Sequence, residues 1–349
     1  MRMDVSSSHQ PLFSVVIPVF NHAQYLRECL TSVLAQSLAD FELIVVDDAS
    51  TDPQVWQILE PFAADARVRL YKNASNLGIS STQNRAVANA RADYIALVDC
   101  DDRLDPQALA TMWAAIQENN YPDYLFSDRR NMDANGHALY DAVYGHVASG
   151  QGIVRDLQDR MIASHLKVIR KQAYEQAGGV SDRYRGIQDW ELALAIARFG
   201  RIVYVPQVLY WHRLHGASVT QSDHRGQALK TNLLRRQHLE TLWRTSSAAV
   251  EHAGVAQFKL ADLAGKSWYC PDSVIQAWQA GARCHLDARG EQTDSSIEFL
   301  KDFNSYFDRI LVDRVDVACR VVGTMDRPGS LVSPLSMVCF ETSAQQVGS

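Results

Sequence analysis

The sequence predicts an α/β fold with a doubly wound, mostly parallel sheet, on the basis of three observations. Short β-branched segments alternate with segments of helical period over residues 13–99. The segments between the predicted strands are long enough to be crossover helices, which join parallel strands. Acidic clusters follow two of the predicted strands, and in open parallel sheets ligands bind beyond the carboxyl ends of the strands.

The N-terminal elements follow from the hydrophobic pattern. Short apolar runs predict strands at residues 13–20 (FSVVIPVF), 41–48 (FELIVVDD), 67–72 (RVRLYK) and 93–99 (DYIALVD). Helical spacing of apolar side chains predicts helices at residues 23–37, 55–62 and 79–92. The faces expected to be buried carry Leu26, Cys29, Leu30, Val33, Leu34, Val55, Ile58, Leu59, Phe62, Ile79, Ala86, Val87 and Ala90.

Later elements are marked by turns and caps. Asn135-Gly136 predicts a hairpin, and residues 146–163 a loop that enters a helix. A helix is expected at residues 189–200, with Gly200 as its C-cap and an apolar face of Leu192, Ala195, Ile196 and Phe199; a strand follows at 201–206. We expect one catalytic-type domain at residues 10–225 and a mainly helical C-terminal extension at residues 226–349.

Composition excludes several classes. With 34 basic and 40 acidic residues the formal charge is −6, which excludes a general nucleic-acid binder. The six cysteines form no CxxC pair and are expected to be reduced. No apolar run resembles a signal peptide or approaches the roughly 20 residues of a membrane span, so we expect a cytoplasmic protein.

The helix expected at residues 226–244 is amphipathic. Leu229, Leu233, Leu239 and Trp243 share an arc, with Leu234 outside it and basic residues beside it. This pattern permits peripheral contact with anionic lipid at the inner membrane face, but it favours an ordinary, partly solvated helix.

Asp99, Asp101 and Asp102 stand within four positions after a predicted strand. Like charges at this spacing repel, so the cluster predicts a cation among them, and oxygen ligands at a strand end suit Mg²⁺ or Mn²⁺. The alternative is a solvated loop or the N-terminus of a helix that starts at Asp105-Pro106.

The order of motifs resembles the inverting family 2 glycosyltransferases of the GT-A (nucleotide-diphospho-sugar transferase) fold, in the bacterial O-antigen and capsule branch. The matching segments include SVVIPVFNHAQYL, FELIVVDDASTD, NLGISSTQN, YIALVDCDD, GIQDWELAL and LYWHRLHGASVT, spread over residues 13–225. Two departures stand out: Gln83 precedes Asn84 where many members carry arginine, and Gln188 precedes Asp189 where many carry glutamate.

The resemblance implies roles for individual residues. Phe20 would stack on the nucleotide base, Asp48 would accept from the base or ribose, and Asp99 would contact the ribose or the metal. Asp101 would be the direct ligand of Mn²⁺ or Mg²⁺, with His215 completing the metal shell or touching phosphate. The other residues expected to bind substrate are Pro18, Asn21, Asn76, Gly78, Asn84, Gln188, Trp190 and Arg213.

Asp189 resembles the family's general base. A sugar hydroxyl needs a carboxylate within hydrogen-bond reach to attack an anomeric carbon. The alternative is a capping carboxylate at the start of a helix.

The resulting expectation is a metal-dependent, inverting transfer of sugar from a nucleotide diphosphate to a hydroxyl of a glycan or lipid-linked acceptor, in bacterial polysaccharide synthesis. The C-terminal extension is a candidate for homo-oligomer contacts. Two rivals remain. A sugar nucleotidyltransferase would need a Gly-rich, basic loop where this chain has PVFNHAQYL. A non-catalytic sugar- or nucleotide-binding module of a larger synthase is disfavoured by the joint presence of Asp48, Asp99, Asp101 and Asp189.

Overall fold

The computed structural model describes residues 9–145, 153, 157 and 161–216, and a set of shorter pieces: 230, 231, 234, 255–259, 273, 274, 277, 283–287, 309–312 and 337–340. The chain divides into two compact units, Met1–Ser222 and Asp223–Ser349. The predicted domain boundary at residue 225 lies outside the described residues and stays a prediction.

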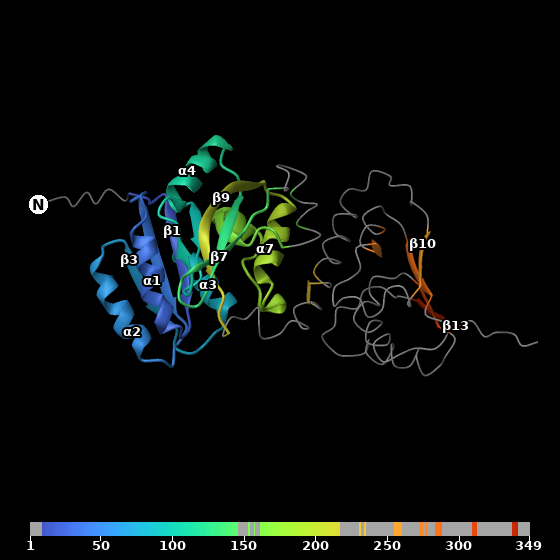
Figure 1. Cartoon of the computed structure of the whole chain (residues 1–349), viewed down its shortest axis with the longest axis horizontal. Helices are drawn as coiled ribbons and strands as arrows, with labels where there is room; N and C mark the ends of the chain where they lie inside the picture. The colour runs from blue at the N-terminus through green and yellow to red at the C-terminus, as the bar shows by residue number, and fades with distance from the viewer. Residues whose placement is uncertain are drawn as a thin grey trace, which may run out of the picture. The chain divides into compact units, whose positions relative to one another are not determined.

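The first unit is built on one nine-stranded sheet (Figure 1). The strands run in the order β3-β2-β1-β4-β8-β6-β9-β5, and β7 pairs with β6. Their bounds are β1 Phe13–Val19, β2 Phe41–Asp47, β3 Val68–Lys72, β4 Tyr94–Leu97, β5 Arg103–Leu104, β6 Tyr124–Met132, β7 Ala138–Ala142, β8 His165–Arg170 and β9 Ile202–Arg213. The β6–β7 pair confirms the hairpin predicted around Asn135-Gly136.

Helices pack on both faces of the N-terminal half of this sheet. On one face Phe13, Val15 and Ile17 join a core that contains the apolar sides of α1, α2 and α4. Alternate residues such as Val16 and Ile44 are buried on the opposite face, where α3 contacts β1 and β2. The helices are α1 Ala23–Leu34, α2 Gln54–Leu59, the 3₁₀ turn η1 Glu60–Ala64, α3 Ile79–Ala88, α4 Ala108–Glu118, α6 Lys171–Gln176, the 3₁₀ turn η2 Asp182–Tyr184 and α7 Gln188–Ala197.

The sheet is parallel from β3 to β4, as expected, and mixed beyond β4. Strand β8 runs antiparallel to both β4 and β6, while β6 and β9 are parallel. We did not predict β8, because its sequence HLKVIR carries three basic or imidazole side chains. Lys167 is nevertheless only 2% exposed, since acidic partners meet it inside the fold.

The helix α7 differs in detail from the prediction. Its buried residues are Trp190, Leu192, Ala193, Leu194 and Ile196, so the buried face of the helix is wider than the single apolar stripe that was predicted. Phe199, expected on the apolar face, is 44% exposed because the helix has already ended at Ala197. Arg198 rather than Gly200 is the C-cap residue.

The described part of the second unit includes a four-stranded parallel sheet that the sequence reading did not anticipate. Its strands β10 Val255–Lys259, β11 Arg283–Asp287, β12 Arg309–Val312 and β13 Met337–Phe340 are neighbours in chain order. Most of the helix expected at residues 226–244 lies outside the described residues; Leu234, which we placed off its apolar arc, is buried. Among the described residues, no helix combines the length and apolarity needed to cross a bilayer.

Candidate active site

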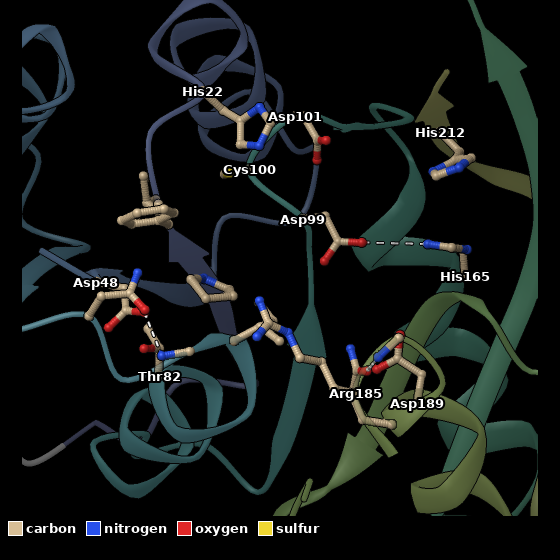
Figure 2. Close-up of a pocket in the computed structure, with 18 residues that line it drawn as sticks. His22, Asp48, Thr82, Asp99, Cys100, Asp101, His165, Arg185, Asp189 and His212 are labelled. Carbon is tan, nitrogen blue, oxygen red and sulfur yellow. Dashed lines mark hydrogen bonds and ion pairs between the residues drawn. The ribbon is translucent and has the colours of Figure 1, made fainter. Parts of the chain in front are cut away.

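A cavity of about 460 Å³ opens at the carboxyl ends of β1, β2 and β4 (Figure 2). Nine of the residues singled out from the sequence line it: Pro18, Phe20, Asp48, Asn76, Gly78, Asp99, Asp101, Gln188 and Asp189. Val19, His22, Ile79, Thr82, Cys100, His165, Arg185, Gly186 and His212 complete the lining. Segments more than 160 residues apart in sequence therefore share one wall, as the strand-end rule predicts.

One end of the cavity presents an exposed aromatic ring beside a buried carboxylate. Phe20 follows β1 and is 41% exposed, so its ring is available for stacking. Asp48 is 3% exposed, and its oxygens accept hydrogen bonds from the backbone N–H groups of Leu77 and Gly78 at 2.8 and 2.9 Å. This bonding fixes the turn before α3, where Gly78 adopts a φ of 83°.

Asp99 is held by basic side chains from β8. Its Oδ2 lies 3.6 Å from His165 Nε2. The guanidinium of Arg129 donates to His165 Nδ1 at 3.1 Å, so Nε2 carries the ring proton and faces Asp99. Burial would raise the pKa of Asp99, but Lys167 and His165 hold it well below its usual range.

Asp101 forms one corner of a potential metal site. Its Oδ2 lies 2.8 Å from Nε2 of His215, and a ring nitrogen of His22 completes a group whose ligand atoms are all within 4.8 Å of one another. Carboxylate and imidazole groups are suitable ligands for Mn²⁺ and related divalent ions. The residues present therefore fit the cation that the sequence predicts.

Asp102 belongs to a buried framework rather than to the cavity wall. It accepts from the backbone N–H of Arg213 at 2.7 Å and lies 3.3 Å from Nδ1 of His212. Burial raises the pKa of Asp102 to about 6, with His212 opposing and the neighbouring carboxylates adding to the rise. It does not cap the following helix, whose N-cap residue is Gln107.

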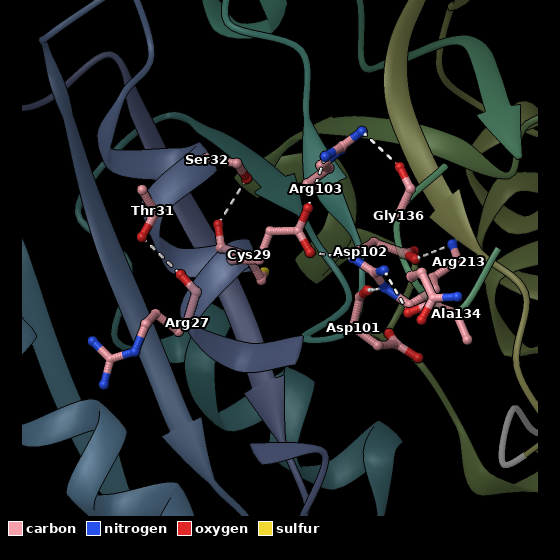
Figure 3. A network of polar contacts seen from close by, with 12 residues as sticks. Arg27, Cys29, Thr31, Ser32, Asp101, Asp102, Arg103, Ala134, Gly136 and Arg213 are labelled. Atoms are coloured by element: carbon pink, nitrogen blue, oxygen red, sulfur yellow. Dashed lines mark hydrogen bonds and ion pairs between the residues drawn. The ribbon is translucent and has the colours of Figure 1, made fainter. Parts of the chain in front are cut away.

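The prediction that Arg213 contacts substrate needs correction. Arg213 is 1% exposed, and its guanidinium donates to the Asp101 carbonyl, the Ala134 carbonyl and Glu28 Oε2 (Figure 3). It also lies over the ring of Tyr25 at 4.6 Å. Arg213 therefore links the Asp101 loop to α1 and to the β6–β7 turn, because its guanidinium hydrogen-bonds to all three.

Asp189 lies across the cavity from Asp48 (Figure 2). Its Oδ2 accepts from Nζ of Lys167 at 2.7 Å, and its side chain is 25% exposed. Burial would lower the pKa of Lys167, but Asp189 and Asp99 raise it above its ordinary value, so the ammonium stays charged. Asp189 makes no capping bond, since Ile187 occupies the N-cap position of α7.

Three further residues expected to bind substrate face elsewhere. Asn21 Oδ1 accepts from the N–H groups of Thr51 and Asp52 and ties together the loops after β1 and β2. Asn84 bonds to both backbone groups of Val180. Trp190 is buried and donates from Nε1 to the Leu157 carbonyl at 2.6 Å. Each of these three side chains is therefore hydrogen-bonded to the protein backbone.

The sequence reading missed several lining residues. Arg185 reaches into the cavity from the loop before α7, as Figure 2 shows. The wall thus contains a cation although Gln83 stands where many family members carry arginine. His165 was missed because β8 was not recognised, and so was Lys167, which does not line the cavity but pairs with Asp189. His212 lies within the segment LYWHRLHGASVT, but no role was assigned to it from the sequence.

Comparison with known proteins gives the family. The model of Glycosyl transferase family 2 matches residues 14–177. Residues 14–177 of this chain thus match a glycosyl transferase family 2 domain. The resemblance stated from the sequence is thereby confirmed.

The curated relatives of this domain include a chondroitin synthase and an O-antigen biosynthesis protein. Chondroitin synthase of Escherichia coli is 24% identical over 253 residues, which is 72% of this chain and 34% of that protein. The O-antigen biosynthesis protein RfbC of Myxococcus xanthus is 31% identical over 227 residues, 64% of this chain and 17% of that protein. The chain thus spans about a third or less of these curated relatives.

Solved structures support the GT-A fold. S. aureus TarS 1–349 in complex with UDP-GlcNAc has a TM-score of 0.54 at 21% identity, over 68% of this chain and 73% of TarS 1–349. The mannosyltransferase PcManGT of Pyrobaculum calidifontis, in complex with GDP-Man and Mn²⁺, has a TM-score of 0.50 at 18% identity, over 68% of this chain and 65% of the other. At these identities the likeness concerns the fold.

Proposed function

We propose that this protein is a metal-dependent, inverting glycosyltransferase that transfers a sugar from a nucleotide diphosphate to a hydroxyl group. The observation that carries the proposal is one cavity lined by Phe20, Asp101 and Asp189. An aromatic surface for a base, a ligand for a cation beside a diphosphate, and a further carboxylate are the groups that this reaction requires.

The residues divide the work by position. Phe20 stacks on the base, and the Asp48-bonded turn at Gly78 shapes the adjoining wall. Asp101 and His215 hold the divalent cation, which when bound neutralises charge on the diphosphate leaving group. Asp189 accepts the proton of the acceptor hydroxyl, while Lys167 keeps its carboxylate in a fixed orientation through the 2.7 Å hydrogen bond.

The setting that the relatives favour is polysaccharide synthesis. Chondroitin synthase and an O-antigen biosynthesis protein are among them, and structural neighbours hold UDP-GlcNAc or GDP-Man with Mn²⁺. We infer a nucleotide-sugar donor and a glycan or lipid-linked acceptor for this chain. Peripheral membrane contact and self-association through residues 226–349 remain part of this proposal.

The proposal is tested by turnover and donor affinity measured on the same variants. UDP-, GDP- and dTDP-sugars are first screened by thermal shift with and without Mn²⁺. A donor at about 100 times its dissociation constant should add about 2.7 kcal/mol of stability. Asp101→Ala should remove the Mn²⁺-dependent part of that binding.

Asp189→Asn then tests the base. Asparagine can still accept the hydrogen bond from Lys167 but cannot take a proton, so kcat should fall by roughly 10²–10⁴ while donor affinity stays nearly constant. Glu175→Gln is the matched control, because Glu175 is an exposed carboxylate of α6 outside the cavity. Near-normal turnover of the Asp189 variant would exclude it as the base.

A further inference from the structure

His22 stands beside the Asp101–His215 pair although no spacing in the sequence connects it with them. Its ring meets that of His215 at a centroid distance of 5.3 Å and an interplanar angle of 66°. Its ligand atom lies within 4.8 Å of those of Asp101 and His215. Figure 2 shows His22 next to Asp101 at the edge of the cavity.

The backbone holds His22 in this place. It is the N-cap residue of α1 and adopts left-handed angles, φ 57° and ψ 30°, directly after Asn21 with φ 60°. Left-handed residues other than glycine are uncommon and persist where surrounding contacts fix them. Here the Asn21 side chain accepts from Thr51 and Asp52, which anchors the turn.

The ring nitrogens of His22 are available as metal ligands. Within the part of the chain that the structure describes, no group hydrogen-bonds its imidazole, and the residue is only partly buried. Tyr25 packs against His215 at 5.0 Å and against His22 at 6.5 Å, so one aromatic ring supports both imidazoles. This packing restricts the orientations of both imidazole rings.

We infer that His22 is a third protein ligand of the divalent cation, so that the site is a two-histidine, one-carboxylate site. The inference deepens the proposed function, because it concerns the cation of that same cavity. Ligand atoms about 2.0–2.2 Å from one ion lie roughly 3–4 Å apart, so the three groups need only a small closure to share an ion.

Two imidazoles change which ion the site favours. Mg²⁺ prefers oxygen ligands and retains several waters. The affinity of imidazole nitrogen for transition metals, by contrast, increases from Mn²⁺ to Co²⁺ to Ni²⁺. His22 therefore makes this cavity selective for transition metals over Mg²⁺. A site built only from Asp101 and His215 would discriminate less.

His22→Asn tests the inference on the full-length protein by calorimetric titration with CoCl₂, MnCl₂ and MgCl₂, without any sugar donor. Asparagine tolerates left-handed angles, so the turn should survive. We expect Co²⁺ affinity to fall by about tenfold or more, Mn²⁺ affinity to fall less, and Mg²⁺ affinity to stay within about twofold. His22→Asp supplies an oxygen ligand instead, so it should recover Mn²⁺ affinity and raise Mg²⁺ affinity without restoring the Co²⁺ preference.

His9→Ala is the control, because His9 is an exposed histidine outside the cavity whose ring pairs with Asp40. In the unaltered protein, Co²⁺ should protect His22 and His215, and not His9, from diethyl pyrocarbonate, which is read by mass spectrometry. Unchanged Co²⁺ affinity, an equal loss for all three ions, or an unprotected His22 would overturn the inference. If the His22 variants bind metal normally but Asp101→Ala loses all metal binding, only the inference about His22 fails. The proposed function would then stand.

Discussion

We expect Lys167→Met to destabilise the fold less than Asp189→Ala, although both substitutions break the same buried ion pair. The Lys167 side chain is 3% exposed and the Asp189 side chain 25% exposed, with 2.7 Å between Nζ and Oδ2. Without Lys167, the Asp189 carboxylate can still be hydrated from the cavity. Without Asp189, the ammonium would be left in the sheet without its hydrogen-bonded partner, with Asp99 and Asp102 as its remaining acidic neighbours.

The magnitudes follow from this difference in exposure. Lys167→Met removes a hydrogen bond to a charged group that is already partly hydrated, which should cost about 1–3 kcal/mol of unfolding free energy. Asp189→Ala leaves a buried charge without its partner, which should cost about 3–5 kcal/mol. The double variant removes both charges and should be more stable than Asp189→Ala alone.

A double-mutant cycle measures the coupling. Urea unfolding of the four proteins, followed by far-UV circular dichroism and by tryptophan fluorescence, gives the free energies. Turnover of Lys167→Met should fall as well, because the carboxylate loses its fixed orientation. Costs that add within about 0.5 kcal/mol, or a larger loss for Lys167→Met than for Asp189→Ala, would refute the assignment of this pair.

Two further predictions concern the framework. Burial would raise the pKa of Glu42, but hydrogen bonds from a serine and two arginines, Arg91 among them, lower it. The ionised Glu42 carboxylate therefore stabilises the fold above its ordinary pKa of about 4.3, and this stabilisation is lost as the pH falls below that value. Glu42→Gln should lower the free energy of unfolding by about 1–3 kcal/mol at pH 7 and make that free energy less dependent on pH in acid. Gly178→Ala should cost about 1–2 kcal/mol for its φ of 87°. Gly179→Ala should cost about 1–3 kcal/mol more, because its Cβ would lie 2.5 Å from Asn84 Oδ1; equal thermal stability of the two would contradict this.

The N-terminal half of the fold was predictable because its strands carry their signal locally. β1, β2 and β4 are buried on both faces and appear in the sequence as continuous apolar runs. β8 carries no such signal. Lys167 can be buried there because Asp189, 22 positions later, and Asp99 from the end of β4 lie against it.

The site was predictable to the extent that strand ends determine it. Asp48, Asp99 and Asp101 follow strands and meet in one cavity, as expected. Asn84 and Arg213 lie within matching motifs, yet their side chains turn to Val180 and to Glu28. Proximity to a motif in sequence does not reveal which neighbour a side chain will satisfy.

The crowding of Asp99, Asp101 and Asp102 is resolved differently from what their spacing predicts. We expected a cation among them, bound by Asp101 and Asp99, to offset their repulsion. Asp99 instead faces His165 and Lys167, and Asp102 receives the backbone N–H of Arg213. Repulsion within the cluster is thus offset largely by protein groups from β8 and β9. The proposed metal dependence therefore rests on Asp101, whose neighbours His215 and His22 carry imidazole groups that can ligate a cation. The affinity of this group for transition metals is the measurement that tests it.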